Sequence, residues 1–172
     1  GRMCESGLTA TVAFNGGTSD WGADAITATW RRDGDSYVLD GEYRYVVDGH
    51  TAELLIVAAR EEGTVGEQGI SLFLLPAETP GVTRQWLPTM DQARKQASLQ
   101  LSGVTLAHTA LMGEAGNAWT HLSAVLDLAA IALAAEQVGG CQQLLDQVVE
   151  YTSERVQFNR TIASFQAVKH KA

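Results

Sequence analysis

The chain has 172 residues, of which 45% are hydrophobic and 19% charged, a balance that suits one soluble globular domain or one domain and part of another. Its formal net charge is −8, because 20 acidic residues outnumber 12 Lys and Arg. That excess of acid argues against a nucleic-acid-binding protein, which needs Lys and Arg gathered on one face. An anionic ligand would have to be held by local Arg side chains and backbone N–H groups.

The sequence shows no pattern of disulfide bonds, membrane insertion or metal binding. Cys4 and Cys141 lie far apart and form no C-x-x-C pair, so no disulfide framework is expected. No run of about eighteen uncharged apolar residues occurs, and the chain opens without a signal-peptide pattern. The histidines lack the spacing of metal ligands, so no metal site is predicted. We expect a cytoplasmic protein without a membrane span.

Residues 8 to about 105 carry the short alternating patterns of β-strands. Asp33-Gly34 predicts a hairpin turn, because glycine tolerates the positive φ that a two-residue turn requires. Asp40-Gly41 is expected to bridge two further strands. Short strands at this spacing, with no helical pattern between them, predict an antiparallel sandwich or barrel. The predicted strands cover residues 8–14, 25–30, 37–39, 43–47, 54–59 and 70–75.

From Gly116 the hydrophobic residues recur at the three- and four-residue steps of a helix. We predict one long helix from about residue 117 to 157 and a second helix from near Ile162. Gly139-Gly140 leaves two interpretations, a break in the helix or a close approach by a neighbouring backbone. Because the pattern resumes at Leu144, a continuous helix is favoured. Its apolar stripe predicts self-association.

In the segment 154–171, Arg155 with two Phe and two Gln stands in a register that resembles the R-x-Q-F-G-x-x-I-x-x-F-Q-A segment of the acyl-CoA dehydrogenases. Residues 33–41 and 69–75 resemble that family's middle β domain. The resemblance implies an α+β chain, with an antiparallel β-barrel or sandwich domain over 1–113 and the first long helices of a C-terminal helical bundle over 114–172. We expect the chain to be part of a longer protein.

In that family the C-terminal segment contacts the adenine-dinucleotide half of FAD, mostly that of a neighbouring subunit. A guanidinium fork matches the geometry of a pyrophosphate. The alternative is that Arg155 is a solvated charge at a helix end. Arg160 matches nothing that the motif requires. The cofactor contacts implied by the resemblance are Arg155, Gln157, Phe158, Ile162, Phe165 and Gln166, with Ser19 near the flavin.

Positions that surround the flavin ring in the family differ in this sequence. Residues 12–20 resemble V-T-E-P-x-x-G-S-D, with Ser19 kept but Ala13 in place of Thr. Residues 45–49 resemble W-I-T-N-G, with Tyr45 for Trp and Val47 for Thr. The catalytic Glu of most members would lie beyond residue 172, and the helix position used by a minority is Ala129. No catalytic residue is therefore assigned to this chain.

The resemblance implies a subunit or fragment of an FAD-dependent acyl-CoA dehydrogenase, which desaturates an acyl-CoA thioester at its α,β bond. It further implies a dimer or tetramer of identical or homologous subunits and an electron-transfer flavoprotein as partner. One alternative is a catalytically degenerate subunit that lends Arg155 to a partner's FAD, similar to heteromeric members of actinobacterial steroid catabolism. Another is a fragment that binds nothing. We expect the isolated chain not to retain FAD.

Overall fold

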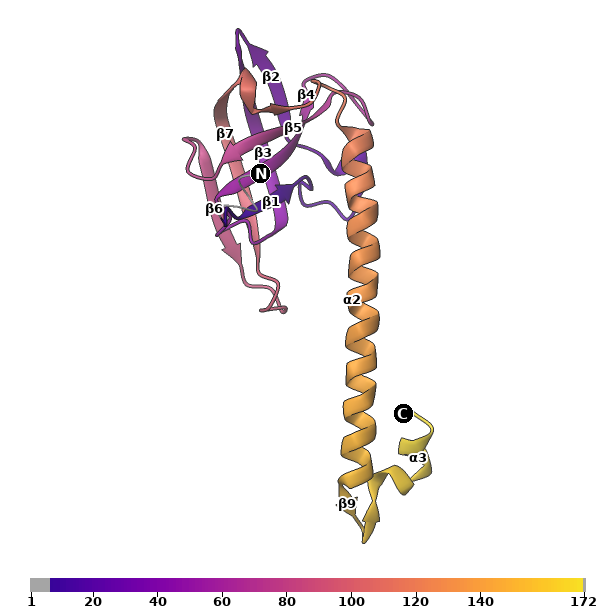
Figure 1. Cartoon of the computed structure of the whole chain (residues 1–172). Helices are drawn as coiled ribbons and strands as arrows, with labels where there is room; N and C mark the ends of the chain where they lie inside the picture. The colour runs from indigo at the N-terminus through magenta and orange to yellow at the C-terminus, as the bar shows by residue number, and fades with distance from the viewer. Residues whose placement is uncertain (1–6, 172) are drawn as a thin grey trace. The chain divides into compact units, whose positions relative to one another are not determined.

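The structure is a computed structural model that describes residues 7–171 (Figure 1). It confirms the α+β class, because strands dominate the first part of the chain and one long helix follows. The chain divides into two compact units, one ending at Ser123 and the other beginning at Ala124. Each unit is described by itself.

Within the described residues, the first unit contains one eight-stranded sheet in the order β6-β7-β3-β2-β4-β5-β8, with β1 paired to β4. Two 3-10 turns, η1 (Ala23–Ala25) and η2 (His108–Ala110), lie between strands. The strands are β1 (Ala10–Ala13), β2 (Thr29–Asp33), β3 (Ser36–Val47), β4 (Leu54–Glu61), β5 (Ile70–Pro76), β6 (Val82–Leu87), β7 (Gln96–Ala107) and β8 (Leu111–Met112).

The sheet is mostly antiparallel, as predicted, but it also contains two parallel pairs that the prediction did not include. β4 runs parallel to β1, with Ala10 opposite Leu54, and parallel to β2, with Thr29 opposite Arg60. The remaining pairs in this sheet are antiparallel. Alternation of apolar and polar residues reports which face of a strand is buried, but it carries no information on the direction of the neighbouring strand.

The β2–β3 hairpin is confirmed. The two strands predicted on either side of Asp40-Gly41 are instead one continuous strand, β3. Asp33 pairs with Ser36 around Gly34, whose φ is +60°. Asp40-Gly41 is no turn, because β3 continues through it with a shift in register against β7. A Cβ on Gly41 would lie 2.5 Å from the Cα of Ala28. Glycine is needed at this position for close contact between two segments of backbone.

The core shows that the sheet folds back over itself. The rings of Tyr37 in β3 and Phe73 in β5 lie 5.2 Å apart, although two strands separate β3 from β5 in the sheet. The Tyr43 hydroxyl donates a hydrogen bond to the carbonyl oxygen of Ala58 in β4, at 3.0 Å. Burial raises the pKa of this phenol. The folded sheet thus encloses one apolar core, as a sandwich does.

The second unit contains most of α2 (Trp119–Glu154), then β9 (Val156–Gln157), β10 (Arg160–Thr161), η3 (Ile162–Ser164) and α3 (Gln166–Lys169). The long helix is confirmed, with ends within three residues of those predicted. The β9–β10 hairpin was not predicted. At Ile162 the chain forms a 3-10 turn, and the second helix begins only at Gln166, because Phe165 has extended backbone angles.

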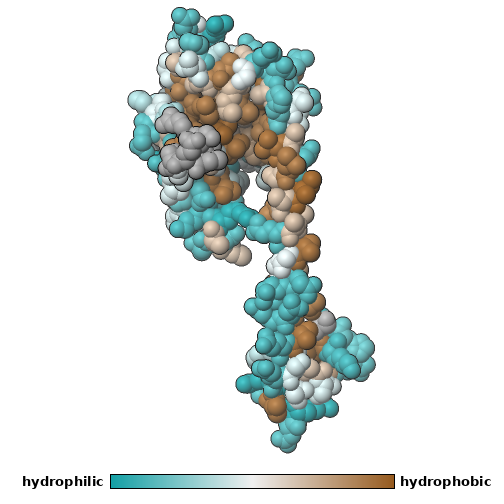
Figure 2. Space-filling model, viewed as in Figure 1, coloured by the Kyte–Doolittle hydropathy of each residue, from teal (hydrophilic) through white to brown (hydrophobic). Residues whose placement is uncertain are grey.

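α2 passes through Gly139-Gly140 without a break, so that alternative is wrong. In the described structure, a Cβ on either glycine would meet no atom within 4 Å. Apolar side chains such as Leu128 and Ile131 are about two-thirds exposed on this helix. Figure 2 shows hydrophobic residues at the surface of the helix. By length and composition alone, α2 could cross a membrane. The same composition is expected of a helix enclosed by other helices.

Candidate cofactor-binding site

The chain turns sharply where α2 ends, and Arg155 lies at that turn. Its backbone N–H donates to the carbonyl of Tyr151 at 2.9 Å, and its own carbonyl accepts from the N–H of Ile162 at 2.8 Å. These bonds tie the end of the helix to the far end of the hairpin. The Arg155 side chain is exposed. Its charge is well placed to complement the negative helix terminus, and the guanidinium is accessible to an external anion.

A two-residue turn joins β9 to β10 and exposes an aromatic ring. Phe158 and Asn159 have φ values of +57° and +62°, the left-handed geometry of a tight hairpin turn. The Phe158 side chain is 87% exposed. It meets the Phe165 ring edge to face, with centroids 6.1 Å apart. The hairpin therefore presents a ring whose orientation is supported from below by Phe165.

Arg160 takes part in this aromatic cluster. Its guanidinium carbon lies 4.0 Å from the centroid of the Phe165 ring, a cation–π contact. Sequence comparison with the family motif did not indicate this role. Replacement of Arg160 would remove a contact that holds Phe165, and Phe165 in turn contacts Phe158. Arg160 is therefore unsuitable as a neutral control for Arg155.

The other predicted contacts lie in the same segment. Gln157 pairs with Arg160 across the hairpin and is exposed, as is Gln166 at the start of α3. Ile162 is half-buried. Six of the seven predicted cofactor residues are thus brought together in the second unit. A cavity of about 460 Å³ lies beside them, between the last turns of α2 and α3, lined by Val149, Thr152, Ser153, Ala163, Ser164, Val168 and Lys169.

Ser19 lies in the first unit, on a loop shaped by one amide side chain. Asn15 donates from Nδ2 to the carbonyl of Asp20 at 2.8 Å, and its Oδ1 accepts from the N–H of Gly17 at 2.7 Å and of Thr18 at 3.0 Å. Asn15 is almost fully buried, whereas Ser19 is exposed. The loop is therefore rigid beneath Ser19 while leaving its hydroxyl accessible.

The other positions matched to the flavin ring differ in exposure. Ala13 is completely buried in the core, whereas Val47 is 39% exposed. Tyr45 is 56% exposed and has a φ of +60°, in a bulge of β3 against β7. Ala129, the position of the helix-borne base, is exposed on α2 and carries no ionisable group.

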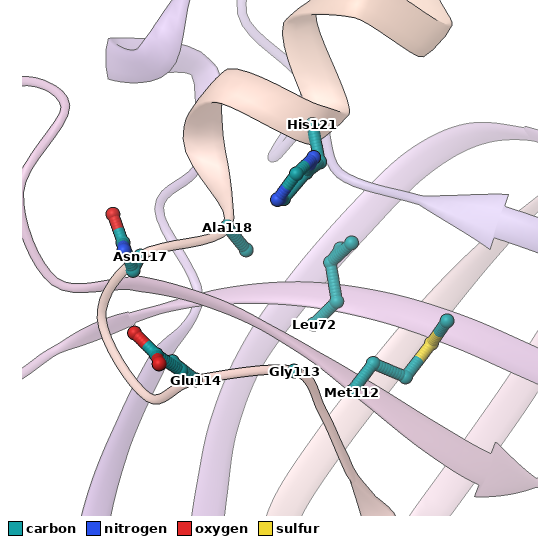
Figure 3. Close-up of a pocket in the computed structure, with 7 residues that line it drawn as sticks. All are labelled: Leu72, Met112, Gly113, Glu114, Asn117, Ala118 and His121. Atoms are coloured by element: carbon teal, nitrogen blue, oxygen red, sulfur yellow. The ribbon is translucent and has the colours of Figure 1, made fainter.

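Sequence reasoning missed an open pocket of about 450 Å³ in the first unit (Figure 3). The His121 imidazole reaches over it from the first turn of α2, above the apolar side chains of Leu72 and Met112, and Glu114 lies at its edge. The Gly116 N–H donates to the Ser71 hydroxyl at 2.7 Å, which holds the loop before α2 against β5. Leu72 lies in the stretch 69–75 that resembles the family, but nothing in the sequence indicated that these residues line a pocket. Among the described residues, no group of His, Cys, Asp and Glu could hold a metal ion.

Two family models match the chain in succession: the acyl-CoA dehydrogenase middle domain over residues 14–104, and the acyl-CoA dehydrogenase C-terminal domain over residues 116–172. The predicted domain boundary at 113/114 falls between these matches, and the compact units divide ten residues later, after Ser123.

Relatives agree with this assignment. The chain is 30% identical to the 3-(aryl)acrylate reductase of Clostridium sporogenes, over 97% of this chain and 44% of that protein. It is 32% identical to the mitochondrial short-chain specific acyl-CoA dehydrogenase of Bos taurus, over 91% of this chain and 38% of that protein. Butyryl-CoA dehydrogenase from Megasphaera elsdenii superposes with a TM-score of 0.89 at 25% identity, covering 99% of this chain and 45% of that one. The chain spans less than half the length of these relatives. It belongs to the acyl-CoA dehydrogenase family.

Proposed function

We propose that this chain is part of an FAD-dependent acyl-CoA dehydrogenase that forms a double bond between Cα and Cβ of an acyl-CoA thioester. The observation that carries the proposal is the consecutive match to two domains of this family. The exposed side chains of Arg155, Phe158 and Gln166 support it, because a site that binds an external cofactor must leave its donors and rings accessible. The activity is that of the whole protein, of which this chain covers a part.

The residues of the second unit fit the dinucleotide half of FAD. The Arg155 guanidinium can make two parallel charge-assisted hydrogen bonds to pyrophosphate oxygens. The Phe158 ring offers an open face to the adenine or ribose, and Gln157 and Gln166 offer amide donors and acceptors. In the first unit, the Ser19 hydroxyl can bond to the flavin edge. FAD, when bound, supplies the acceptor for the substrate's β-hydride.

The residue at the position of the helix-borne base cannot remove the α-proton. A general base needs an ionisable group within hydrogen-bond reach of that proton. Alanine at position 129 offers none. In our proposal the base is therefore a carboxylate supplied by a part of the protein outside these 172 residues.

The partners in this proposal are an acyl-CoA substrate, identical or homologous subunits in a dimer or tetramer, and an electron-transfer flavoprotein, in the cytoplasm. The exposed apolar surface of α2 favours burial against further protein. Relatives named for short-chain acyl groups and for aryl acrylates indicate a small acyl group.

FAD retention by the full-length protein tests the role of Arg155. Loss of a partly buried, two-pronged ionic contact removes about 1.5–3 kcal/mol, so we expect Arg155→Ala to weaken FAD binding roughly ten- to a hundredfold. Arg155→Lys should recover only part, because an ammonium cannot form the planar pair. The control is Arg31→Ala, at an exposed position of β2 in the other unit. Equal FAD retention by the Arg155→Ala and Arg31→Ala variants would leave Arg155 as an ordinary helix-end charge.

A second candidate function is that of a degenerate partner subunit without chemistry of its own. It is favoured by Ala13, Val47 and Ala129, which stand where the family motifs carry Thr, Thr and Glu. The two functions differ in one measurement. If the full-length protein binds FAD, and acyl-CoA added without oxygen bleaches the flavin absorbance, the subunit is catalytic. FAD binding without bleaching by any acyl-CoA would favour the degenerate subunit.

A further inference from the structure

Trp21 differs from an ordinary core tryptophan. Trp30 is buried, and its indole N–H donates to the carbonyl of Gly69 at 2.9 Å. Trp21, in contrast, is 68% exposed. Its ring contact is with Phe14, at 5.6 Å between centroids and a tilt of 55°. Within residues 7–171, the indole N–H of Trp21 has no hydrogen-bond partner. Most of this large ring is therefore open to an external partner.

The backbone that carries Trp21 is held firmly. The Asp20 carboxylate accepts hydrogen bonds from the N–H of Trp21 at 2.7 Å and of Gly22 at 3.0 Å. The carbonyl of Asp20 accepts from the buried Asn15 amide. An exposed aromatic ring on a backbone fixed in this way loses little conformational entropy when it binds a ligand.

A second exposed aromatic residue, Tyr45, follows a residue that is hydrogen-bonded to Asn15. The carbonyl of Asn15 accepts from the N–H of Arg44 at 2.9 Å, and Tyr45 comes next in the chain. Tyr45 lies at φ +60° in a β-bulge, a strained conformation for a bulky residue. Strain of this kind, like a bulge, occurs preferentially at functional sites. Near Asn15 the structure thus combines an exposed indole on a hydrogen-bonded backbone, an exposed phenol and an exposed serine, Ser19.

We propose that Trp21 is a stacking residue for a planar conjugated ring, belonging either to the flavin or to an aryl group on the acyl chain of the substrate. The proposal rests on the proposed function and adds a residue to it, because Trp21 is not among the cofactor contacts implied by the family motif. A ring bound against Trp21 would cover its open face, and the Ser19 hydroxyl can donate to an oxygen or nitrogen at the ring edge.

Tryptophan fluorescence of the full-length protein tests the proposal with three probes: FAD, a 3-phenylpropanoyl thioester of CoA, and butanoyl-CoA. We expect FAD or the phenylpropanoyl thioester to quench Trp21, and butanoyl-CoA to leave its emission unchanged. Trp21→Ala should weaken binding of the quenching ligand about tenfold, and Trp21→Phe should recover most of that loss because it keeps a ring. Trp86→Ala is the matched control, since Trp86 is also exposed, in β6.

The outcomes distinguish failure of the role proposed for Trp21 from failure of the proposed function. Loss of affinity for FAD alone assigns the ring to the flavin, and loss for the phenylpropanoyl thioester alone assigns it to the substrate. Binding and quenching of every probe unchanged in Trp21→Ala would overturn the role of Trp21 and leave the proposed function intact. A wild-type protein that binds neither FAD nor any thioester would overturn both.

Discussion

Replacement of Gly41 by alanine tests whether this residue is needed for close packing of two backbone segments. The added Cβ would lie 2.5 Å from the Cα and 2.6 Å from the Cβ of Ala28, atoms that cannot swing away as a long side chain can. Overpacking of this kind costs about 1–3 kcal/mol. The φ of +145° is a glycine conformation, and an L-residue held there costs about 1–3 kcal/mol more.

The two effects together should destabilise the first unit by about 2–6 kcal/mol, a large part of the stability of a typical domain. For a chain of this size, that corresponds to a melting temperature roughly 5–20 °C lower, measured by circular dichroism. Gly34→Ala is the control, because Gly34 has φ +60° but no atom within 4 Å of the added Cβ. Its loss should be only about 1–2 kcal/mol. Melting temperatures within about 2 °C for the two variants would refute the close-packing argument.

Two further predictions concern α2. Gly139→Ala should stabilise the helix by about 1 kcal/mol, because an added Cβ meets no atom within 4 Å and alanine is the better helix former. A lower melting temperature would show that another chain or segment packs against Gly139. The exposed apolar side chains of α2, including Val125, Leu133, Leu144 and Val148, should make the chain self-associate at tens of micromolar, and a single monomeric species by light scattering would contradict this expectation.

The residues of the candidate cofactor site could be picked out from sequence, but their arrangement could not. The register of Arg155, Phe158 and Phe165 was enough to indicate the family. The cation–π contact of Arg160 with Phe165 depends on the hairpin that folds β10 toward η3, and a two-residue strand leaves no periodic signal. The hydrogen bonds of Asn15 that hold the loop carrying Ser19 were likewise not predicted. Its rigidity comes from hydrogen bonds of a single side chain.

By itself the sequence determined the change from strands to a long helix, the hairpin at Gly34 and the family, because each depends on local periodicity, turn chemistry or a contiguous motif. Only the tertiary structure decided the parallel pairing of β4 with β1 and β2, and the continuity of β3 through Gly41. Gly41 looks like a turn residue in sequence, yet it is required because Ala28 passes 2.5 Å from where a side chain would begin. The identity of a residue shows which conformations it permits, whereas the neighbour that makes one of them necessary, here Ala28, belongs to another segment of the chain.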